Sequence, residues 1–117
     1  MRKIIKIDQY NCNLIVILSD KIKEDTNKLL KKDKLSHRID YEIEGIFLYH
    51  DIDKYYLLIS QQHLSHNTIA HEVYHAVVRI TEDREINDEE SQAWLMGYIT
   101  EQIYKFINKK NVEIKHK

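Results

Sequence analysis

The sequence predicts one α+β domain over residues 1–117, with a small twisted β-sheet packed on helices from the second half of the chain. Three observations predict this class. A length of 117 residues is typical of a single domain. Apolar residues run together or alternate through much of the first half, as they do in strands. From about residue 67 onward they recur at one-turn spacing, as they do in amphipathic helices.

In the first half we expect strands and one helix. Residues 14–18 form an apolar run rich in β-branched side chains, which indicates a buried strand. Residues 22–32 follow as a charged helix with a narrow apolar stripe, and Ser19 and Asp20 precede it as turn or N-cap residues. Residues 39–59 are typical of a β-hairpin with a connection of four to five residues, whose turn type stays open.

Two longer helices are expected in the second half, over about residues 67–81 and 88–108, joined by a charged stretch. Residues 109–117 are expected to be frayed or to form a short strand. The apolar stripe of the first helix consists of Ile69, Val73, Ala76, Val77 and Ile80. The stripe of the second helix consists of Leu95, Met96, Ile99, Ile103 and Phe106.

The composition argues against several classes of protein. Lys and Arg number 18 against 19 Asp and Glu, for a net charge of −1, so no electrostatic argument favours a nucleic-acid or membrane partner. The single cysteine, Cys12, excludes a disulfide framework and a multi-cysteine zinc site. No apolar run approaches the ~20 residues that span a bilayer, and the N-terminus lacks the apolar stretch of a signal peptide. We expect a cytoplasmic protein, with a virion-associated location left open.

Residues 71–75 read His-Glu-Val-Tyr-His, an H-E-x-x-H motif in the first of the two long helices. Residues i and i+4 share a helix face, so His71 and His75 can reach one metal ion. On a helical wheel His75 lies about 40° from His71, Glu72 about 100°, and the apolar stripe at about 140–240°. The histidines therefore face away from the core. Glu72 stands beside the metal position, where it can take a proton from a metal-bound water.

Catalytic zinc takes three protein ligands and a water, so this motif leaves one ligand to be found. We expect Glu90, at the start of the last helix, to supply it, with Glu89 as the alternative. Ala93 and Gly97 leave a shallow groove beneath Glu90, where another helix could approach closely. A competing interpretation is a capping box, in which Asn87 is the N-cap and Glu90 the residue three positions later.

The two segments resemble zincin metallopeptidases of the Glu-zincin branch, in which a second helix supplies a glutamate as the third ligand. The matching stretches are residues 68–77 and 90–98, about a sixth of the chain. The gap of 14 residues between His75 and Glu90 is similar to that of compact bacterial and phage members, such as the ImmA/IrrE type. The chain departs from the pattern at Tyr74, since many active-site helices of this class carry Gly before the second histidine.

The resemblance implies a minimal zincin-like fold and a zinc-dependent hydrolase that cleaves peptide bonds in a peptide or protein substrate. Zinc would be the cofactor, held by His71, His75 and Glu90, and Glu72 would be the catalytic general base. The zinc ion would also polarise the substrate carbonyl. A peptidase this small has little surface for substrate selection, so a partner protein could supply specificity.

Further expectations concern the surroundings of the zinc site. By resemblance, the strand at residues 55–59 could line the cleft and pair with an extended peptide, although an ordinary buried strand is the competing interpretation. Tyr98, Tyr104 and His66 are candidates to stabilise an oxyanion, and the sequence does not choose among them. Trp94 is expected to pack against the helix that carries the histidines.

Two other functions stay open. The first is a zinc-stabilised binding or structural protein of a phage or mobile element that keeps the ligands without turnover. It predicts a large loss of stability with a chelator and no cleavage of any peptide. The second is a metal-free interaction module in which the motif is accidental, and there a chelator changes nothing. Substrate and oligomeric state are not predicted.

Overall fold

The computed structural model describes residues 1–32, 41–51 and 53–115, and it has the α+β architecture that the sequence predicts. Apart from two short 3₁₀ helices, η1 (Asp8–Tyr10) and η2 (Gln61–His63), the elements are strands and α-helices. In chain order they are β1 (Arg2–Ile7), β2 (Cys12–Ser19), α1 (Ile22–Lys32), β3 (Gly45–Asp51), β4 (Lys54–Ser60), α2 (His66–Asp83) and α3 (Glu89–Lys109).

The described residues form a four-stranded mixed sheet in the order β1-β2-β4-β3. The pairs β1–β2 and β3–β4 are antiparallel. The central pair, β2–β4, is parallel, with Asn13 opposite Lys54 and Ser19 opposite Ser60. A parallel pair needs a long crossover, and here α1 and the segment after it make that connection. In the strand order given above, β3 lies at one edge of the sheet.

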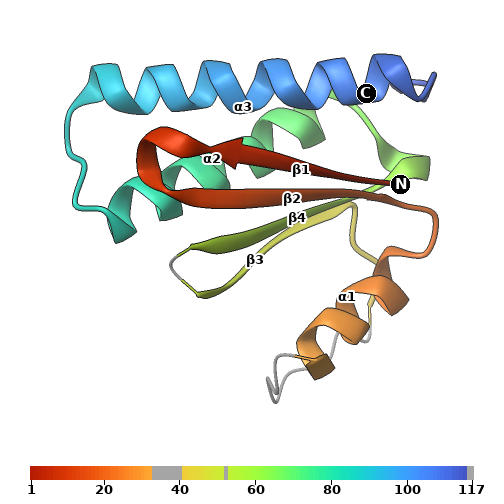
Figure 1. Ribbon diagram of the computed structural model, residues 1–117. Coiled ribbons are helices and arrows are strands. Elements are labelled where there is room, and N and C mark those ends of the chain that lie inside the picture. Colours follow the sequence, from red (N-terminus) through yellow and green to blue (C-terminus); the bar gives the residue numbers. More distant parts are fainter. Residues whose placement is uncertain (33–40, 52, 116–117) are drawn as a thin grey trace.

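Helices cover both faces of the sheet (Figure 1). Helices α2 and α3 lie over one face and enclose the larger apolar cluster, while α1 lies over the other face and encloses a smaller one. Successive side chains of β3 point to opposite faces of the sheet, and so to the two apolar clusters. Phe47 packs at the border of the larger cluster, whereas Ile46 and Leu48 pack against the smaller one.

Two parts of the strand prediction were wrong. Strand β1 was not anticipated, although Ile5 and Ile7 are buried against α3 and the rest of the sheet. Strand β3 begins at Gly45 and not near residue 39, because residues 41–44 are irregular and Tyr41 is 66% exposed. The predicted residues 39–40 lie outside the described part of the chain. The hairpin of β3 and β4 is confirmed, with a shorter connection than expected.

The helix predictions are confirmed to within two residues at each end. The predicted N-cap of α3 was wrong, however. Asp88, not Asn87, is its N-cap, and the Asp88 carboxylate accepts a hydrogen bond from the Ser91 backbone N–H at 2.9 Å. Hydrogen bonds from Ser91 hold the pKa of Asp88 below its usual value. The capping-box interpretation of Glu90 therefore fails, because Glu90 is the second helical residue and not the third.

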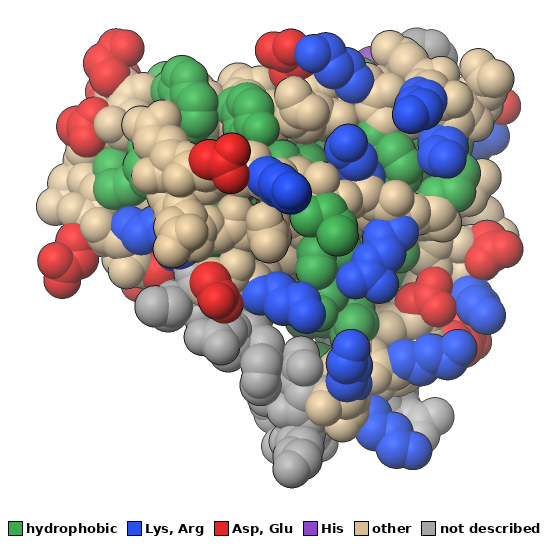
Figure 2. All heavy atoms as spheres, in the orientation of Figure 1, with side chains coloured by type: hydrophobic (Ala, Val, Ile, Leu, Met, Phe, Trp, Pro, Cys, Tyr) green, Lys and Arg blue, Asp and Glu red, His purple; other side chains and the backbone are tan. Residues whose placement is uncertain are grey.

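Charge is unevenly spread over the surface. Figure 2 shows Lys and Arg side chains gathered where the end of α3 lies near the start of β1. A cavity of about 250 Å³ in that region is lined largely by cations, and Lys105 is paired there with Glu101 at 2.8 Å. No helix among the described residues is long and apolar enough to cross a membrane. The cations that line the cavity are Arg2, Lys3, Lys105, Lys109 and Lys110.

Candidate metal centre

His71 and His75 lie side by side on the exposed face of α2, one helical turn apart. Their Nε2 atoms are 3.2 Å apart, and the two rings are nearly perpendicular, with centroids 4.7 Å apart. Two nitrogen ligands that each lie 2.0–2.1 Å from a tetrahedral zinc ion are about 3.3 Å apart. The two nitrogen atoms lie within hydrogen-bond distance of each other, and this separation also matches that of two ligands of one zinc ion.

The orientation of α2 follows from its apolar stripe and its N-cap. The five predicted stripe residues are all buried, and both histidines are exposed, as the helical wheel predicts. At the start of α2, the buried Ser65 hydroxyl accepts a hydrogen bond from the Thr68 backbone N–H at 3.1 Å. The stripe fixes the rotation of the helix and the cap fixes its beginning, so together they direct the histidines outward.

Glu72 is buried beside this pair, with only 5% of its surface exposed. Its Oε2 atom lies 4.0 Å from Nε2 of His71. Burial raises the pKa of the Glu72 carboxyl, and the charges of His71 and His75 partly oppose that rise. A carboxylate with a raised pKa accepts a proton more readily near neutral pH, which is the direction that suits a general base.

Two cavities meet at Glu72, on the side of α2 that faces the edge strand β3. One has a volume of about 300 Å³ and is lined by the start of β3 and the first turns of α2. The other has a volume of about 390 Å³ and continues along β3 to Tyr49 and Arg79. The residues that line both are Gly45, His71 and Glu72. Together they form an open groove between α2 and β3, with the histidine pair on its rim.

The strand beside this groove is a correction to the sequence analysis. Strand β4 pairs with β2 on one side and with β3 on the other, so it offers no free edge to a peptide. Its residues from Tyr55 to Ile59 are at most 3% exposed. Residues 55–59 therefore do not line the cleft, and the competing interpretation of an ordinary buried strand is confirmed. Strand β3 occupies that place, since the hairpin puts β4 inside the sheet.

The structure does not bring Glu90 together with the histidine pair. No three His, Cys, Asp or Glu side chains form a metal-holding group within the part of the chain that the structure describes. Glu90 is exposed and shares a face of α3 with Trp94, four residues later. Trp94 stacks on Tyr98 and meets the ring edge of Tyr10. This face is turned toward η1 and β1, so the expected packing of Trp94 against α2 is wrong.

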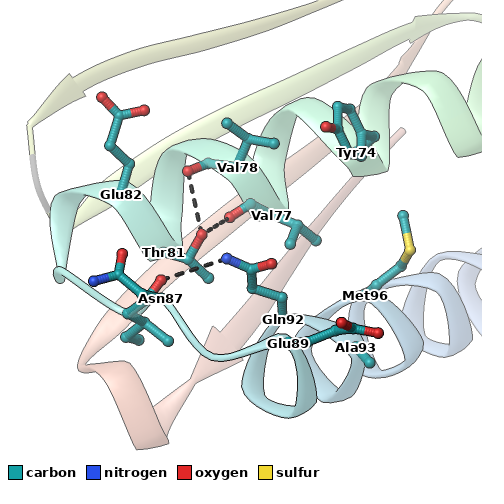
Figure 3. A pocket seen from close by; sticks show the side chains of 11 residues that line it. Tyr74, Val77, Val78, Thr81, Glu82, Asn87, Glu89, Gln92, Ala93 and Met96 are labelled. Carbon is teal, nitrogen blue, oxygen red and sulfur yellow. Dashed lines mark hydrogen bonds between the residues drawn. The ribbon is translucent and has the colours of Figure 1, made fainter.

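Glu89, the alternative ligand, lies on the side of α3 that faces α2. It lines a largely apolar cavity of about 440 Å³ between the two helices (Figure 3). Val78 and Tyr74 contribute to this cavity from α2, and Val78 also lines the groove beside the histidines. Ala93 lines the cavity too, whereas a Cβ atom added at Gly97 would meet nothing within 4 Å. The shallow groove expected on α3 is therefore not filled by a helix at Gly97.

The three oxyanion candidates are engaged in other contacts. The Tyr98 hydroxyl donates to the backbone oxygen of Lys6 at 2.8 Å, and so ties α3 to β1. His66 and Tyr104 bond to each other, with Nδ1 and the hydroxyl oxygen 2.6 Å apart, and their rings stack. None of the three lines the groove beside the histidines.

Two groove residues escaped the sequence analysis. Arg79 lies one turn after His75, and its guanidinium stacks over the Tyr49 ring at 4.1 Å. The four-residue spacing from His75 was a signal for it. Gly45 lies directly against Glu72. It is one of only two glycines in the chain and falls inside a predicted strand, which was a signal of close approach.

Comparison of the chain with protein-family models, with curated proteins and with solved structures found no match. The functional argument therefore rests on the residues of α2 and the groove beside them.

Proposed function

We propose that this protein is a zinc-dependent metallopeptidase that hydrolyses peptide bonds. His71 and His75 are two of the zinc ligands in this proposal, Glu90 is the third and Glu72 is the general base. The observation that carries the proposal is the 3.2 Å separation of the two Nε2 atoms, with the buried carboxylate of Glu72 next to them. This combination supplies two nitrogen ligands and a proton acceptor at one point of the groove.

Zinc held by the histidines would supply a Lewis acid for the peptide carbonyl and would lower the pKa of a water molecule. The residues of the chain do the rest. Glu72 accepts the proton of the attacking water and later returns it to the leaving amine. Among the described strands β3 lies at the edge of the sheet beside the groove, where the backbone of an extended peptide can pair with it.

The third ligand is the part of the proposal that rests on the sequence alone. Glu90 is the assignment that the zincin resemblance implies, and Glu89 stays the alternative. Glu89 lines the cavity between α2 and α3, and Val78 of α2 lines both this cavity and the groove beside the histidines. Both carboxylates belong to the first turn of α3. A variant of each residue, made one at a time, shows which carboxylate contributes to zinc binding.

Glu72→Gln tests the assigned chemistry. It keeps the shape of the side chain and removes its ability to accept a proton. Turnover of a peptide panel is expected to fall about 10²–10⁴-fold, the usual range for loss of a general base. Zinc per chain, measured by elemental analysis, is expected to stay at the parent level, whereas His71→Ala is expected to lose it.

Glu82→Gln is the matched control, because Glu82 is an exposed carboxylate on the same helix. Among the described ion pairs, Glu82 pairs only with Arg79. It is expected to retain parent activity and zinc. Undiminished turnover in Glu72→Gln would refute the role of Glu72. A parent chain that binds no zinc would refute the whole proposal.

A second candidate function is a protein that binds zinc without turnover. The observation that favours it is the lack of a third metal-binding side chain beside the histidines in the described residues. It predicts that zinc binds through His71 and His75 and that no peptide in the panel is cleaved. Zinc content together with turnover of the parent chain separates the two candidates.

A further inference from the structure

The sheet approaches the proposed general base closely at Gly45, the first residue of β3. A Cβ atom added to Gly45 would lie 2.9 Å from Cγ, 3.0 Å from Oε2 and 3.1 Å from Cδ of Glu72. Separations near 3 Å are well inside van der Waals contact between carbon atoms. Any side chain at position 45 therefore has to displace Glu72 or push β3 away from α2.

The position of Gly45 in β3 explains why a side chain there would meet Glu72. Gly45 and Phe47 are two residues apart on β3, so both point to the sheet face that α2 covers. Glu72 lies on the side of α2 that faces this strand, and the two residues line both cavities of the groove. No positive φ angle is involved, so the need for glycine comes from the approach of Glu72 and not from the backbone conformation.

We propose that Gly45 is a positioning residue, whose missing side chain leaves the space in which the Glu72 carboxylate sits beside the histidine pair. Its catalytic consequence rests on the proposed peptidase function, but the contact itself does not. In this role Gly45 needs no contact of its own with zinc or substrate. It acts through Glu72, and a displacement of about 1 Å in a catalytic group is enough to cost roughly 10²-fold in rate.

A double-mutant cycle tests the contact without any need for activity. Gly45→Ala is placed in the parent chain, in Glu72→Gln, which keeps the size of the side chain, and in Glu72→Ala, which removes it. Thermal unfolding is measured on metal-free protein. We expect Gly45→Ala to lower the midpoint by about 3 °C or more in the first two backgrounds and not in Glu72→Ala. The effect of a glycine-to-alanine change on the unfolded chain is common to all backgrounds and cancels.

Gly97→Ala is the matched control, because Gly97 is the other glycine of the chain and a Cβ atom there meets nothing within 4 Å. It is expected to leave the midpoint unchanged or to raise it, since alanine favours a helix. An equal loss from Gly45→Ala in all three backgrounds would overturn the proposal, because the clash would then not be with Glu72.

Kinetics add a readout that a purely structural glycine would not move. We expect Gly45→Ala to lower kcat about 10-fold or more, with KM and zinc content near the parent values. A kcat equal to that of the parent would overturn the positioning role even if the unfolding cycle showed coupling. If the parent hydrolyses no peptide, the proposed function fails, and the unfolding cycle still decides whether Gly45 sets the position of Glu72.

Discussion

At the scale of single residues, the histidine pair and its glutamate follow from one short motif. Helical periodicity predicts that His71 and His75 share a face away from the core, and the structure confirms it. The buried position of Glu72 was not predictable in the same way. It depends on a strand 27 positions earlier in the chain, whose Gly45 leaves room for the carboxylate. Local spacing therefore predicts the exposed histidine pair, while long-range packing determines the environment of Glu72.

The identity of the proposed third zinc ligand is also decided by single residues, and a pair of variants tests it. We expect Glu90→Ala to weaken zinc binding about 10-fold or more, because a catalytic zinc ion then loses one of three protein ligands. Glu89→Ala is the matched neighbour and is expected to leave the affinity near that of the parent. Zinc titration against a competing chelator measures both. The reverse ranking would assign the ligand to Glu89, and no change in either would remove α3 from the zinc site.

At the scale of elements, the end of α2 is joined to the sheet by a partly buried polar network. The Tyr55 hydroxyl of β4 donates to the Asp83 carboxylate at 2.7 Å and accepts from the Arg84 guanidinium at 2.8 Å. Arg84 also donates through Nε to the backbone oxygen of Tyr10 at 2.8 Å. Burial, followed by the hydrogen bond to Asp83, raises the pKa of Tyr55 above its ordinary value. The network therefore holds the end of α2 against β4 and η1 with Tyr55 protonated.

Tyr55→Phe tests that network. The variant leaves the ring in place and removes the hydroxyl between two charged groups, so we expect a loss of about 1–3 kcal/mol in the free energy of unfolding. Tyr56→Phe is the matched control, because Tyr56 is the next residue of β4 and packs in the smaller cluster on the opposite face. Denaturant unfolding measures both. A loss in Tyr55→Phe no larger than in Tyr56→Phe would contradict the role of the network.

Helices and strands differ in how far the sequence predicts them. The apolar stripe of α2 recurs within a single segment, so periodicity alone locates that helix to within two residues. The sheet depends on pairings between distant segments. Parallel pairing of β2 with β4 puts β4 inside the sheet and β3 at its edge, and no local pattern predicts that order. The error over residues 55–59 follows from this, since an apolar strand was predicted correctly and its neighbours were not.

At the scale of the whole molecule, the fold does not depend on the proposed zinc site for its core. The larger cluster joins strands β1, β2 and β4 of the sheet to helices α2 and α3, and its buried members are apolar. The histidines lie outside it, on the exposed face of α2. A structural zinc ion, by contrast, replaces a core that is too small to fold unaided. Here the metal would be added to a surface that is already folded.

Metal removal therefore has different expected effects on activity and on folding. We expect a chelator to abolish peptide hydrolysis and to leave a cooperative thermal transition at a moderately lower midpoint. Binding to the folded chain alone adds about 2.7 kcal/mol when free zinc is 100 times its Kd, and the chelator removes only that amount. Calorimetry beside the peptide assay, before and after zinc is restored, measures both effects. Loss of the cooperative transition on chelation would contradict this expectation, because it would make zinc a condition of folding and favour the binding protein without turnover.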